Sequence, residues 1–469
     1  MVQTFIFLSI FLFAASAVFS QGLEETDTLK IKELQEMVIS ATRQKENLLQ
    51  APVSIEKMNL QTMRQSAQPG FFDAIQNLKG IQVLTPSLGF KVINARGFAH
   101  TTNVRFVQMV DGVDNQAPHI GAPIGNSLGP NDLDILNVEV VPGSASAMFG
   151  MNAINGIANF ITKNPFEFEG FSFNQKLGVN NVNSPETGGT LMSESNLRFA
   201  KVISPKWAMK INGTVLKGTD WIANNRTDLN PAANLSSGLE GSSNPGMDLV
   251  NIYGDESANR RTLTLDNIQY VVSRTGYAEK EVADYGLQNI KGDVSLFFRP
   301  ATDVEMSYTY RAAVQDNIYQ RTNRFRFDDY FTQQHVFSFQ SATIQSRTYL
   351  TLENTGDSYN IRSMAENVDR GFKSDNDWFK DFTNQFDQSI IEGKSVAEAL
   401  DLGRSFADQG RVQPYSQEMA DRINDLREIN NWDFGAALKV KAKMFHSEFQ
   451  QDISDLLTKV KNGVRVMYG

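Results

Sequence analysis

The chain contains no cysteine among its 469 residues. Disulfide bonds, thiolate metal sites and a lipid-modified N-terminal cysteine are therefore all excluded. Histidine is scarce as well, and the four histidines are scattered along the chain without the spacing of metal ligands: His100, His119, His335 and His446. We accordingly expect no metal site and no cofactor.

Runs of basic residues are also missing. Acidic residues outnumber basic ones by 53 to 44, and the formal net charge is -9, so nucleic acid is not an expected partner. The sequence has no nucleophile elbow, no phosphate-cradling glycine loop and no zinc motif. We therefore expect a protein that is not an enzyme.

A long apolar run occurs once, at the N-terminus. Residues 1–20 read "MVQTFIFLSIFLFAASAVFS", which is about the length of a secretory signal and short for a membrane span. Small residues follow the apolar core, and Ser20–Gln21 fits a cleavage point. No Lys or Arg precedes the run, which leaves a short membrane anchor as the alternative. We predict a signal peptide, because the chain has no second long apolar run.

A single strand pattern follows a polar stretch, residues 21–35, that we expect to be a flexible linker. The segment "LQEMVISATRQ" contains the apolar run Met37–Val38–Ile39 and is typical of an extended strand at residues 36–43. The nearest hairpin-type turn lies far downstream, so the chain offers no neighbouring partner strand. This strand either packs as an edge on the next domain or pairs with a partner outside the chain.

Residues 44–165 are predicted to form one compact α+β domain. Phe71, Ala74, Ile75 and Leu78 have helical spacing, and Gly80 fits a C-terminal cap. Downstream, "NVRFVQMVDGVDN" indicates a strand that ends in an Asp–Gly turn, and "LDILNVEVVPG" indicates another strand. The dipeptide "NP" at residues 164–165 ends the domain.

From residue 166 onward the pattern changes to long alternating segments. Trp207, Met209 and Ile211 share one face of a predicted strand, and Lys210 and Asn212 occupy the other face. The same alternation recurs at residues 289–298 and 304–312. The connection "FRPATDV" is tight, whereas residues 218–284 are long and polar. Short turns at one end and long polar loops at the other end are typical of an outer-membrane barrel.

Residues 367–431 interrupt the alternation with helical periodicity. Trp378, Phe382 and Phe386 are spaced four apart, as are Val396 and Leu400. Alternation resumes at "AALKVKAKMFHSEF". We therefore interpret this segment as a helical loop insertion of the barrel rather than a separate soluble domain.

Several blocks of the compact domain carry a family resemblance. In order, they are "NARGF", "VQMVDGV" and "VEVVPGSASAMFGMNAINGIANFITK". Together with the signal peptide, the lone strand and the alternating segments, they resemble the plug domain of TonB-dependent outer-membrane receptors. The resemblance implies an α+β plug domain inside an antiparallel transmembrane β-barrel of about 22 strands. The chain departs from the family at turn positions, with Lys79–Gly80, Gly143–Ser144 and Asn155–Gly156 in place of the more usual Gly and Pro pairs.

The resemblance also implies a function without chemistry of its own. Such a receptor binds a scarce ligand outside, such as a siderophore, a vitamin or a similar small chelate, and imports it. The implied partners are TonB and, through it, the inner-membrane proton-driven energising complex, together with outer-membrane lipid and the small ligand. A non-transporting envelope binding module built on a plug-like domain is the alternative.

Three sets of residues receive roles from the resemblance. The TonB contact is the lone strand, which would pair by β-augmentation: Glu36, Met37, Val38, Ile39, Ser40, Ala41 and Thr42. Two plug apices, residues 85–90 and 114–126, face outward and supply the candidate ligand contacts Asn115, Gln116 and His119. Turns and plug–barrel contacts of the plug would be formed by Arg96, Gly97, Asp111, Gly112, Gly143 and Gly150.

The chain is short for a complete receptor of this family. Residues 166–469 hold two long insertions, and spanning strands take about ten residues each, so that only about seven to nine strands can be counted. Because a barrel in lipid must close, we expect that the sequence is part of a longer receptor.

Overall fold

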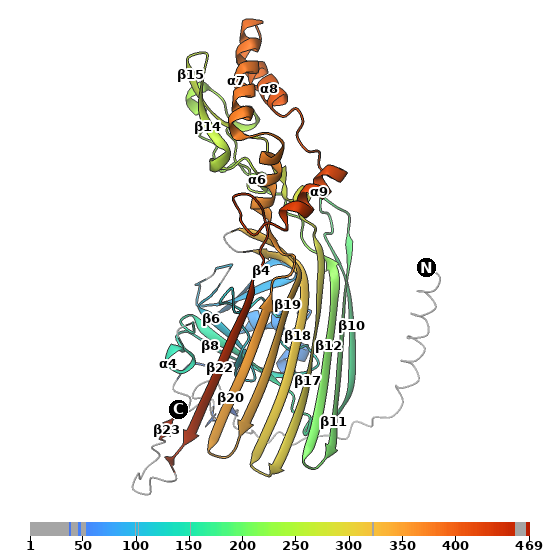
Figure 1. Cartoon of the computed structure of the whole chain (residues 1–469). Coiled ribbons are helices and arrows are strands. Elements are labelled where there is room, and N and C mark those ends of the chain that lie inside the picture. Colours follow the sequence, from blue (N-terminus) through green and yellow to red (C-terminus); the bar gives the residue numbers. More distant parts are fainter. Residues whose placement is uncertain are drawn as a thin grey trace, which may run out of the picture.

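The computed structural model describes residues 37–38, 46–47, 53–98, 100–101, 103–150, 152–320, 323–454 and 466–469. Figure 1 shows three parts: a tall, curved sheet, an α/β domain against its concave side, and a subdomain of helices and hairpins at one end of the strands. We call the first two parts the wall and the plug. The predicted signal peptide lies outside the described residues.

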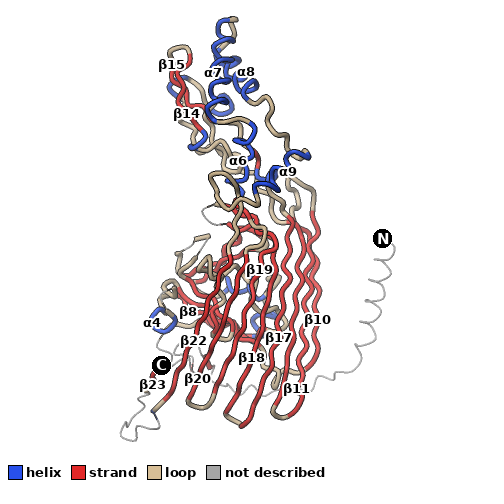
Figure 2. The backbone as a smooth tube through the Cα atoms, in the orientation of Figure 1, coloured by secondary structure: helices blue, strands red, loops and turns tan. Residues whose placement is uncertain are grey.

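The wall is an antiparallel sheet in which most strands pair with their neighbours in sequence (Figure 2). Its long strands are β10 (Gly170–Asn180), β11 (Thr190–Ser204), β12 (Trp207–Thr219), β17 (Gly286–Ala301), β18 (Val304–Gln320), β19 (Arg324–Gln340), β20 (Ile344–Asn354) and β22 (Lys441–Asp452). Two short strands, β21 (Tyr359–Asn360) and β23 (Met467–Tyr468), complete the ten-stranded sheet. Tight turns join β11 to β12, β17 to β18 and β19 to β20, all at one end, which we call the short-turn end.

The faces of the wall have the reverse of a soluble protein's polarity. On β12, Lys210 and Asn212 are 3% and 5% exposed and face the plug, whereas Trp207 and Val215 are 40% and 39% exposed on the outer face. Other outward residues are also large and apolar, among them Phe173, Leu191, Val294, Leu296, Phe337 and Phe445. A sheet that buries its polar face and exposes its apolar face suits a lipid environment. The predicted combination of a plug and a barrel-type sheet is confirmed.

The plug is built around a five-stranded sheet with the order β3–β8–β9–β6–β7. These strands are β3 (Glu56–Asn59), β6 (Phe106–Val110), β7 (Val113–Asp114), β8 (Ile135–Pro142) and β9 (Gly156–Thr162), and a separate hairpin is formed by β4 (Ile81–Ser87) and β5 (Phe90–Ala95). Its short helices are α2 (Leu60–Gln65), α3 (Phe71–Ala74), η2 (Ile75–Asn77) and α4 (Ser146–Phe149). The helix predicted from Phe71 is therefore confirmed, as one α-helical turn that continues into a 3-10 turn.

The core of the plug lies between these helices and its sheet. Phe71, Phe72 and Phe160 make mutual ring contacts at 5.6–6.2 Å and are almost fully buried. The predicted turn at Asp111–Gly112 is also confirmed, because it joins β6 to β7 with φ angles of 55° and 80°. Both angles lie in the left-handed region, which Gly and Asp tolerate better than most residues.

Two insertions between wall strands fold together as one unit, which we call the loop subdomain (residues 220–285 and 355–440). The first contributes η3 (Leu235–Ser237), η4 (Gly241–Ser243), β13 (Ile252–Tyr253), η5 (Ser257–Asn259), β14 (Arg260–Leu265), β15 (Ile268–Ser273), β16 (Tyr277–Ala278) and α5 (Glu279–Val282). The second contributes α6 (Ile361–Phe372), α7 (Asp375–Ile391), α8 (Val396–Ala407) and α9 (Gln417–Leu426). In Figure 1, the β14–β15 hairpin lies beside α7.

Apolar and ionic contacts hold the two insertions together. Tyr270 of the first insertion packs in one buried cluster with Trp378 and Phe386 of the second. Arg274, fully buried, forms ion pairs with Asp369 and Asp375. The helical segment begins at Ile361, a few residues before the predicted insertion at 367–431. None of the helices in the described residues is long and apolar enough to cross a membrane.

The described part of the N-terminal strand lies against the plug. Strand β1 (Met37–Val38) pairs antiparallel with β2 (Glu46–Asn47), so the expectation that the chain offers this strand no neighbouring partner is wrong. The Val38 side chain is buried in a cluster that includes Val107 and Met109 of β6. Of the predicted TonB contact, Glu36 and residues 39–42 lie outside the described residues.

Candidate functional site

The most strongly built polar site lies where the plug meets the wall. One inward-facing residue of each of six neighbouring strands falls in a single register row, which we call the inner row: Arg198, Asn212, Asp293, Arg311, Gln334 and Thr351. Because side chains alternate along a strand, placing one member of the row inward places its cross-strand partners inward as well. The inner row is therefore a continuous polar band facing the plug.

Hydrogen bonds link members of the inner row to one another. Asn212 Nδ2 donates to Asp293 Oδ2 at 3.0 Å. Farther along, Arg311 donates to Gln334 Oε1 at 3.1 Å, and Gln334 Nε2 donates to Thr351 Oγ1 at 3.0 Å. Except for Asp293, which is half-buried, every member is less than 9% exposed. Such a linked, buried network fixes the rotamers of its members.

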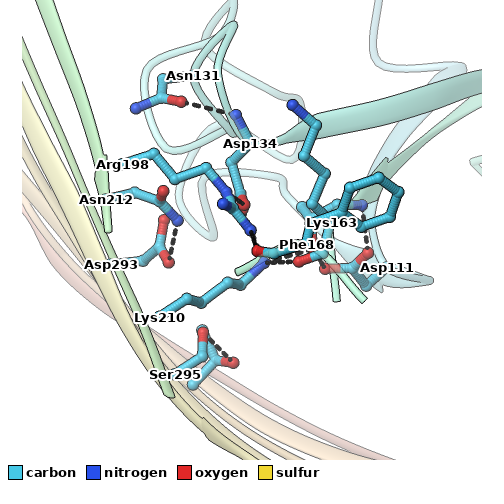
Figure 3. A network of polar contacts seen from close by, with 12 residues as sticks. Asp111, Asn131, Asp134, Lys163, Phe168, Arg198, Lys210, Asn212, Asp293 and Ser295 are labelled. Atoms are coloured by element: carbon cyan, nitrogen blue, oxygen red, sulfur yellow. Dashed lines mark hydrogen bonds and ion pairs between the residues drawn. The ribbon is translucent and has the colours of Figure 1, made fainter. Parts of the chain in front are cut away.

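Asp134 of the plug forms the tightest link to the wall (Figure 3). Its two carboxylate oxygens accept from Arg198 Nε at 2.8 Å and from Lys210 Nζ at 2.7 Å. The three side chains are only 2–4% exposed. Lys210 also donates to Thr162 Oγ1 at 2.7 Å. A buried carboxylate shared by two cations is balanced only while all three groups stay in place, so this triad fixes the plug to β11 and β12.

Two further aspartates of the plug contact wall cations. Asp132 pairs with Lys176 of β10, which also pairs with Glu194 of β11. Asp111 lies 3.5 Å from Arg311. Its Oδ1 accepts from the backbone amide of Thr162, and its Oδ2 accepts from the Thr162 hydroxyl, both at 2.8 Å. Asp111, Asp132 and Asp134 of the plug therefore all lie against basic side chains of the wall.

The plug also carries a half-buried lysine beside these ion pairs. Lys163, next to Thr162, donates to the carbonyl oxygen of Leu133 at 2.7 Å. Burial, and secondly the positive charge of Arg198, lower the pKa of the Lys163 amine below its usual value.

Both predicted apices lie at the end of the wall that carries the loop subdomain. In the first apex, Ser87 Oγ donates to the carbonyl oxygen of Ile318, and the Leu88 amide donates to Asp220 Oδ1, both at 2.8 Å. Gly89 approaches the wall so closely that an added Cβ would lie 2.6 Å from the Leu287 side chain. This apex is therefore held directly against the ends of wall strands.

The second apex contains the three residues predicted to contact ligand. Asn115 is buried, with its backbone amide bonded to the Gln108 carbonyl oxygen at 2.9 Å. Gln116 is half-buried and lies 3.2 Å from Met444 Sδ of β22, and His119 is exposed, with its backbone amide donating to Glu353 Oε2 at 2.6 Å. The structure thus brings Gln116 and His119 to the wall but turns Asn115 into the plug.

Asp114 lies directly before these residues, at the start of the second apex. Its Oδ1 accepts from the backbone amide of Gln116 at 2.9 Å. Burial raises the pKa of the Asp114 carboxyl to about 6, although this hydrogen bond opposes the shift. Within the part of the chain that the structure describes, no group of three or more His, Asp or Glu side chains is arranged to hold a metal ion.

The predicted structural residues of the plug separate into two places. Asp111 and Gly112 lie at the wall, as described above. Arg96 and Gly97, with φ angles of 54° and 78°, form a turn whose guanidinium lies beside Gly143. These three residues line a hollow of about 830 Å³ that is lined by plug residues. Gly150, with φ of 85°, ends α4. Arg96 and Asp111 were both predicted to contact the barrel. Asp111 does contact the wall, whereas Arg96 lies against Gly143 of the plug itself.

A second cavity lies between the plug and the short-turn half of the wall. Its volume is about 650 Å³, within the range of small-molecule sites. The plug contributes Asp111 and Thr162 to its lining, and the wall contributes Glu305, Arg311 and Arg347. The inner row bounds this cavity on the side of the loop subdomain, where its member Arg311 belongs to the lining.

Comparison with known families matches the part of the chain that forms the plug. Residues 47–157 match the family described as the TonB-dependent receptor plug domain. The chain thus carries the plug domain of a TonB-dependent receptor, joined to an antiparallel sheet with an apolar outer face. No curated protein matches the chain.

Solved structures with a similar arrangement include three receptors or transporters. The siderophore receptor PirA from Pseudomonas aeruginosa is 16% identical with a TM-score of 0.37, and the match covers 66% of this chain and 43% of that one. The alcaligin receptor FauA from Bordetella pertussis is 10% identical with a TM-score of 0.40, covering 69% and 42%. The copper transporter OprC is 13% identical with a TM-score of 0.38, covering 64% and 37%. The chain spans about two fifths of the length of these proteins.

Sequence reasoning did not single out the residues that carry the plug–wall contact. Asp134 and Arg198 were missed, and Lys210 and Arg311 were assigned only to a polar strand face. The available signal was a charged residue on a face that alternates with large apolar residues, because a charge facing a barrel lumen needs a partner there.

Proposed function

We propose that the chain forms the plug and part of the barrel wall of an outer-membrane receptor that binds a scarce small ligand outside and imports it into the periplasm. The observation that carries the proposal is the plug-family match at residues 47–157, seated on the buried polar face of a sheet whose other face is apolar. The apolar face suits lipid, and the plug provides a closed resting state.

Energy for import would come from TonB through the N-terminal strand. The segment Glu36 to Thr42 has the residues needed to add a strand to a sheet edge, where main-chain hydrogen bonds supply the grip. Because Met37–Val38 pairs with Glu46–Asn47 and Val38 is buried, this strand would have to leave the plug before TonB could pair with it. Such a release would be a shift between two populations of the segment.

The ligand would bind among the plug apices and the loop subdomain. Gln116 and His119 lie next to β22 and β20 at that end of the wall, and hydrogen-bonding and aromatic side chains there suit a polar chelate or vitamin. The inner row beneath the apices, with its ion pairs to Asp134 and Asp111 of the plug, would keep the passage closed until the plug moves.

The proposal is tested with the protein expressed in its own outer membrane. Growth and uptake are measured on iron chelates and vitamins as the sole source, with and without a deletion of residues 36–42. We expect loss of both TonB co-purification and uptake on deletion, with ligand binding to cells retained. Unchanged uptake after the deletion would refute TonB-driven import and favour a binding module that does not transport.

A further inference from the structure

Two cavities lie one above the other along the same wall strands. The larger one, of about 650 Å³, occupies the short-turn half of the interface. A much smaller one, of about 10 Å³, is lined by Asn131 of the plug and by Asn212, Lys291 and Asp293 of β12 and β17. The smaller volume is about that of one water molecule. Arg311 is the residue that both linings share, so its side chain separates the two spaces.

Buried amide atoms without hydrogen-bond partners follow the same strands. Within the described residues, no partner is present for Asn212 Oδ1 at the small cavity, or for Gln315 Nε2 and Asn317 Oδ1 on β18. The same holds for Asn115 Oδ1 and Asn126 Oδ1 in the second apex. Buried polar atoms are nearly always bonded in native proteins. Such atoms also lie elsewhere, for example Asn174 Oδ1 and Asn259 Nδ2, but those on β12 and β18 give the space between the plug and these strands a polar lining.

The contacts of Arg311 connect it to one hairpin of the plug, β6–β7. Its guanidinium reaches Asp111 at 3.5 Å and Gln334 at 3.1 Å. Gln334 in turn donates to the carbonyl oxygen of Asp114 at 2.9 Å. Asp111 lies in the turn of the β6–β7 hairpin, and Asp114 ends β7 and leads directly into the second apex. A shift of this one hairpin would therefore remove the anion from Arg311 and loosen Gln334 together.

The geometry of Arg311 is weaker than that of the neighbouring triad. Asp134 is held by two cations at 2.7–2.8 Å, whereas the ion pair of Arg311 with Asp111 spans 3.5 Å. The hydrogen-bond energy falls steeply over that range. The interface would thus open first at Arg311, while Asp134 still fixes the plug on β11 and β12.

We propose that solute passes between the plug and strands β12, β17 and β18, and that the Arg311 side chain closes this route in the resting state. The suitable solute is a small molecule rich in hydroxyl and amide groups, because amides and charges line the way. This inference rests on the proposed transport function and adds to it the route and its closing residue.

The route is tested first without any ligand or TonB. The protein, purified from its outer membrane, is placed in planar bilayers and in vesicles, and ion conductance and sucrose permeation are measured. We expect Arg311→Ala to raise both at least tenfold over the unsubstituted protein, and Arg311→Lys to raise them less, because the charge is retained. Arg299→Ala is the matched control, since Arg299 lies on β17 but on neither cavity lining, and it should stay at the resting value. Equal leak through Arg311→Ala and Arg299→Ala, or no leak through either, would overturn the proposal.

The second test closes the route in working cells. Because the chain has no cysteine, the pair Asp111→Cys and Arg311→Cys can be joined with a reductant-cleavable bifunctional thiol reagent. We expect joined cells to bind ligand but to lose uptake, and reduction to restore it. Uptake that continues in the joined protein refutes the route while leaving the transport function intact. Absence of uptake by the unsubstituted protein refutes the transport function instead, and the bilayer result is independent of that outcome.

Discussion

Asp134 of the plug and Arg198 of the wall form an ion pair at 2.8 Å in which the side chains are only 2% and 4% exposed. Lys210 shares the same carboxylate. Removing the anion leaves two buried cations without compensation, and breaking a buried pair in this way costs about 3–5 kcal/mol. The pair is therefore the main ionic attachment of the plug.

We predict that Asp134→Asn loosens the plug without unfolding the wall. The loss should speed hydrogen exchange of the amides at residues 131–134 and 156–163 by about two to three and a half powers of ten, since each 1.4 kcal/mol is a factor of ten. Hydrogen exchange of the purified protein in detergent measures this. Asp73→Asn is the control, because Asp73 pairs with Lys91 within the plug at a partly exposed site, where such pairs contribute about 0–1 kcal/mol. Similar exchange in the two variants would show that the triad does not fix the plug.

The two insertions of the loop subdomain should lose their structure together. Arg274 of the first insertion is fully buried and pairs with Asp369 and Asp375 of the second. Arg274→Ala should therefore expose residues 220–285 and residues 355–440 to protease on intact cells. Both segments should be cleaved at the same protease concentration. Arg261→Ala is the control: Arg261 is exposed, and it contacts the second insertion only through Asn376 and the ring of Phe379. Cleavage confined to one insertion in the Arg274 variant would contradict a single cooperative unit.

The polar faces of the strands could be predicted from the sequence, but the partners could not. Alternation alone assigns Lys210, Asn212 and Arg311 to the face opposite the large apolar residues. The inner row, however, depends on register between strands, and Asn212 and Asp293 come together only because 66 intervening residues form the first insertion. Asp134 lies in another domain, in a stretch that indicates no more than the start of a strand. Long-range charge pairing leaves no local pattern.

The loop subdomain illustrates the same limit. Helical periodicity predicts the second insertion, because Trp378, Phe382 and Phe386 fall on one helix face. The first insertion shows only polar, Gly- and Asn-rich sequence, and its apolar residues Leu265, Tyr270 and Val272 give little sign of a buried hairpin. They become a core only against the helices of the second insertion. A segment that completes its core with a distant segment looks like a loop when it is considered alone.

Asp255 should make the loop subdomain sensitive to pH. Burial, opposed by a hydrogen bond from the Leu249 amide, raises the pKa of the Asp255 carboxyl from 3.8 to about 7. A raised pKa means that the folded state disfavours the ionised form, so the cost is absent below about pH 4 and complete above about pH 7. The subdomain should therefore lose on the order of a few kcal/mol as the pH rises through this window.

Replacing Asp255 with Asn tests this prediction. The amide cannot ionise but can still accept from Leu249, so Asp255→Asn should flatten the pH dependence and increase stability at pH 7. Protease susceptibility of residues 220–285 between pH 4 and 8 measures the effect. Asp266→Asn, at the exposed tip of the β14–β15 hairpin, should keep the original pH profile. A profile that persists unchanged in the Asp255 variant would assign the pH dependence to another group.

Val38 allows backbone pairing to be separated from side-chain packing in the proposed TonB contact. Val38→Ala keeps the amide donor and removes two methyl groups from the cluster with Val107 and Met109, a loss of about 1–2 kcal/mol. Val38→Pro removes the donor as well, and a strand that must add to a sheet edge tolerates that badly. We therefore expect the Pro variant to lose TonB co-purification and uptake, and the Ala variant to keep most of both. Because the Ala substitution also weakens the hold of the plug on this strand, its TonB binding in the absence of ligand should increase. Equal effects of the two substitutions on uptake would show that main-chain pairing at this strand does not transmit the force.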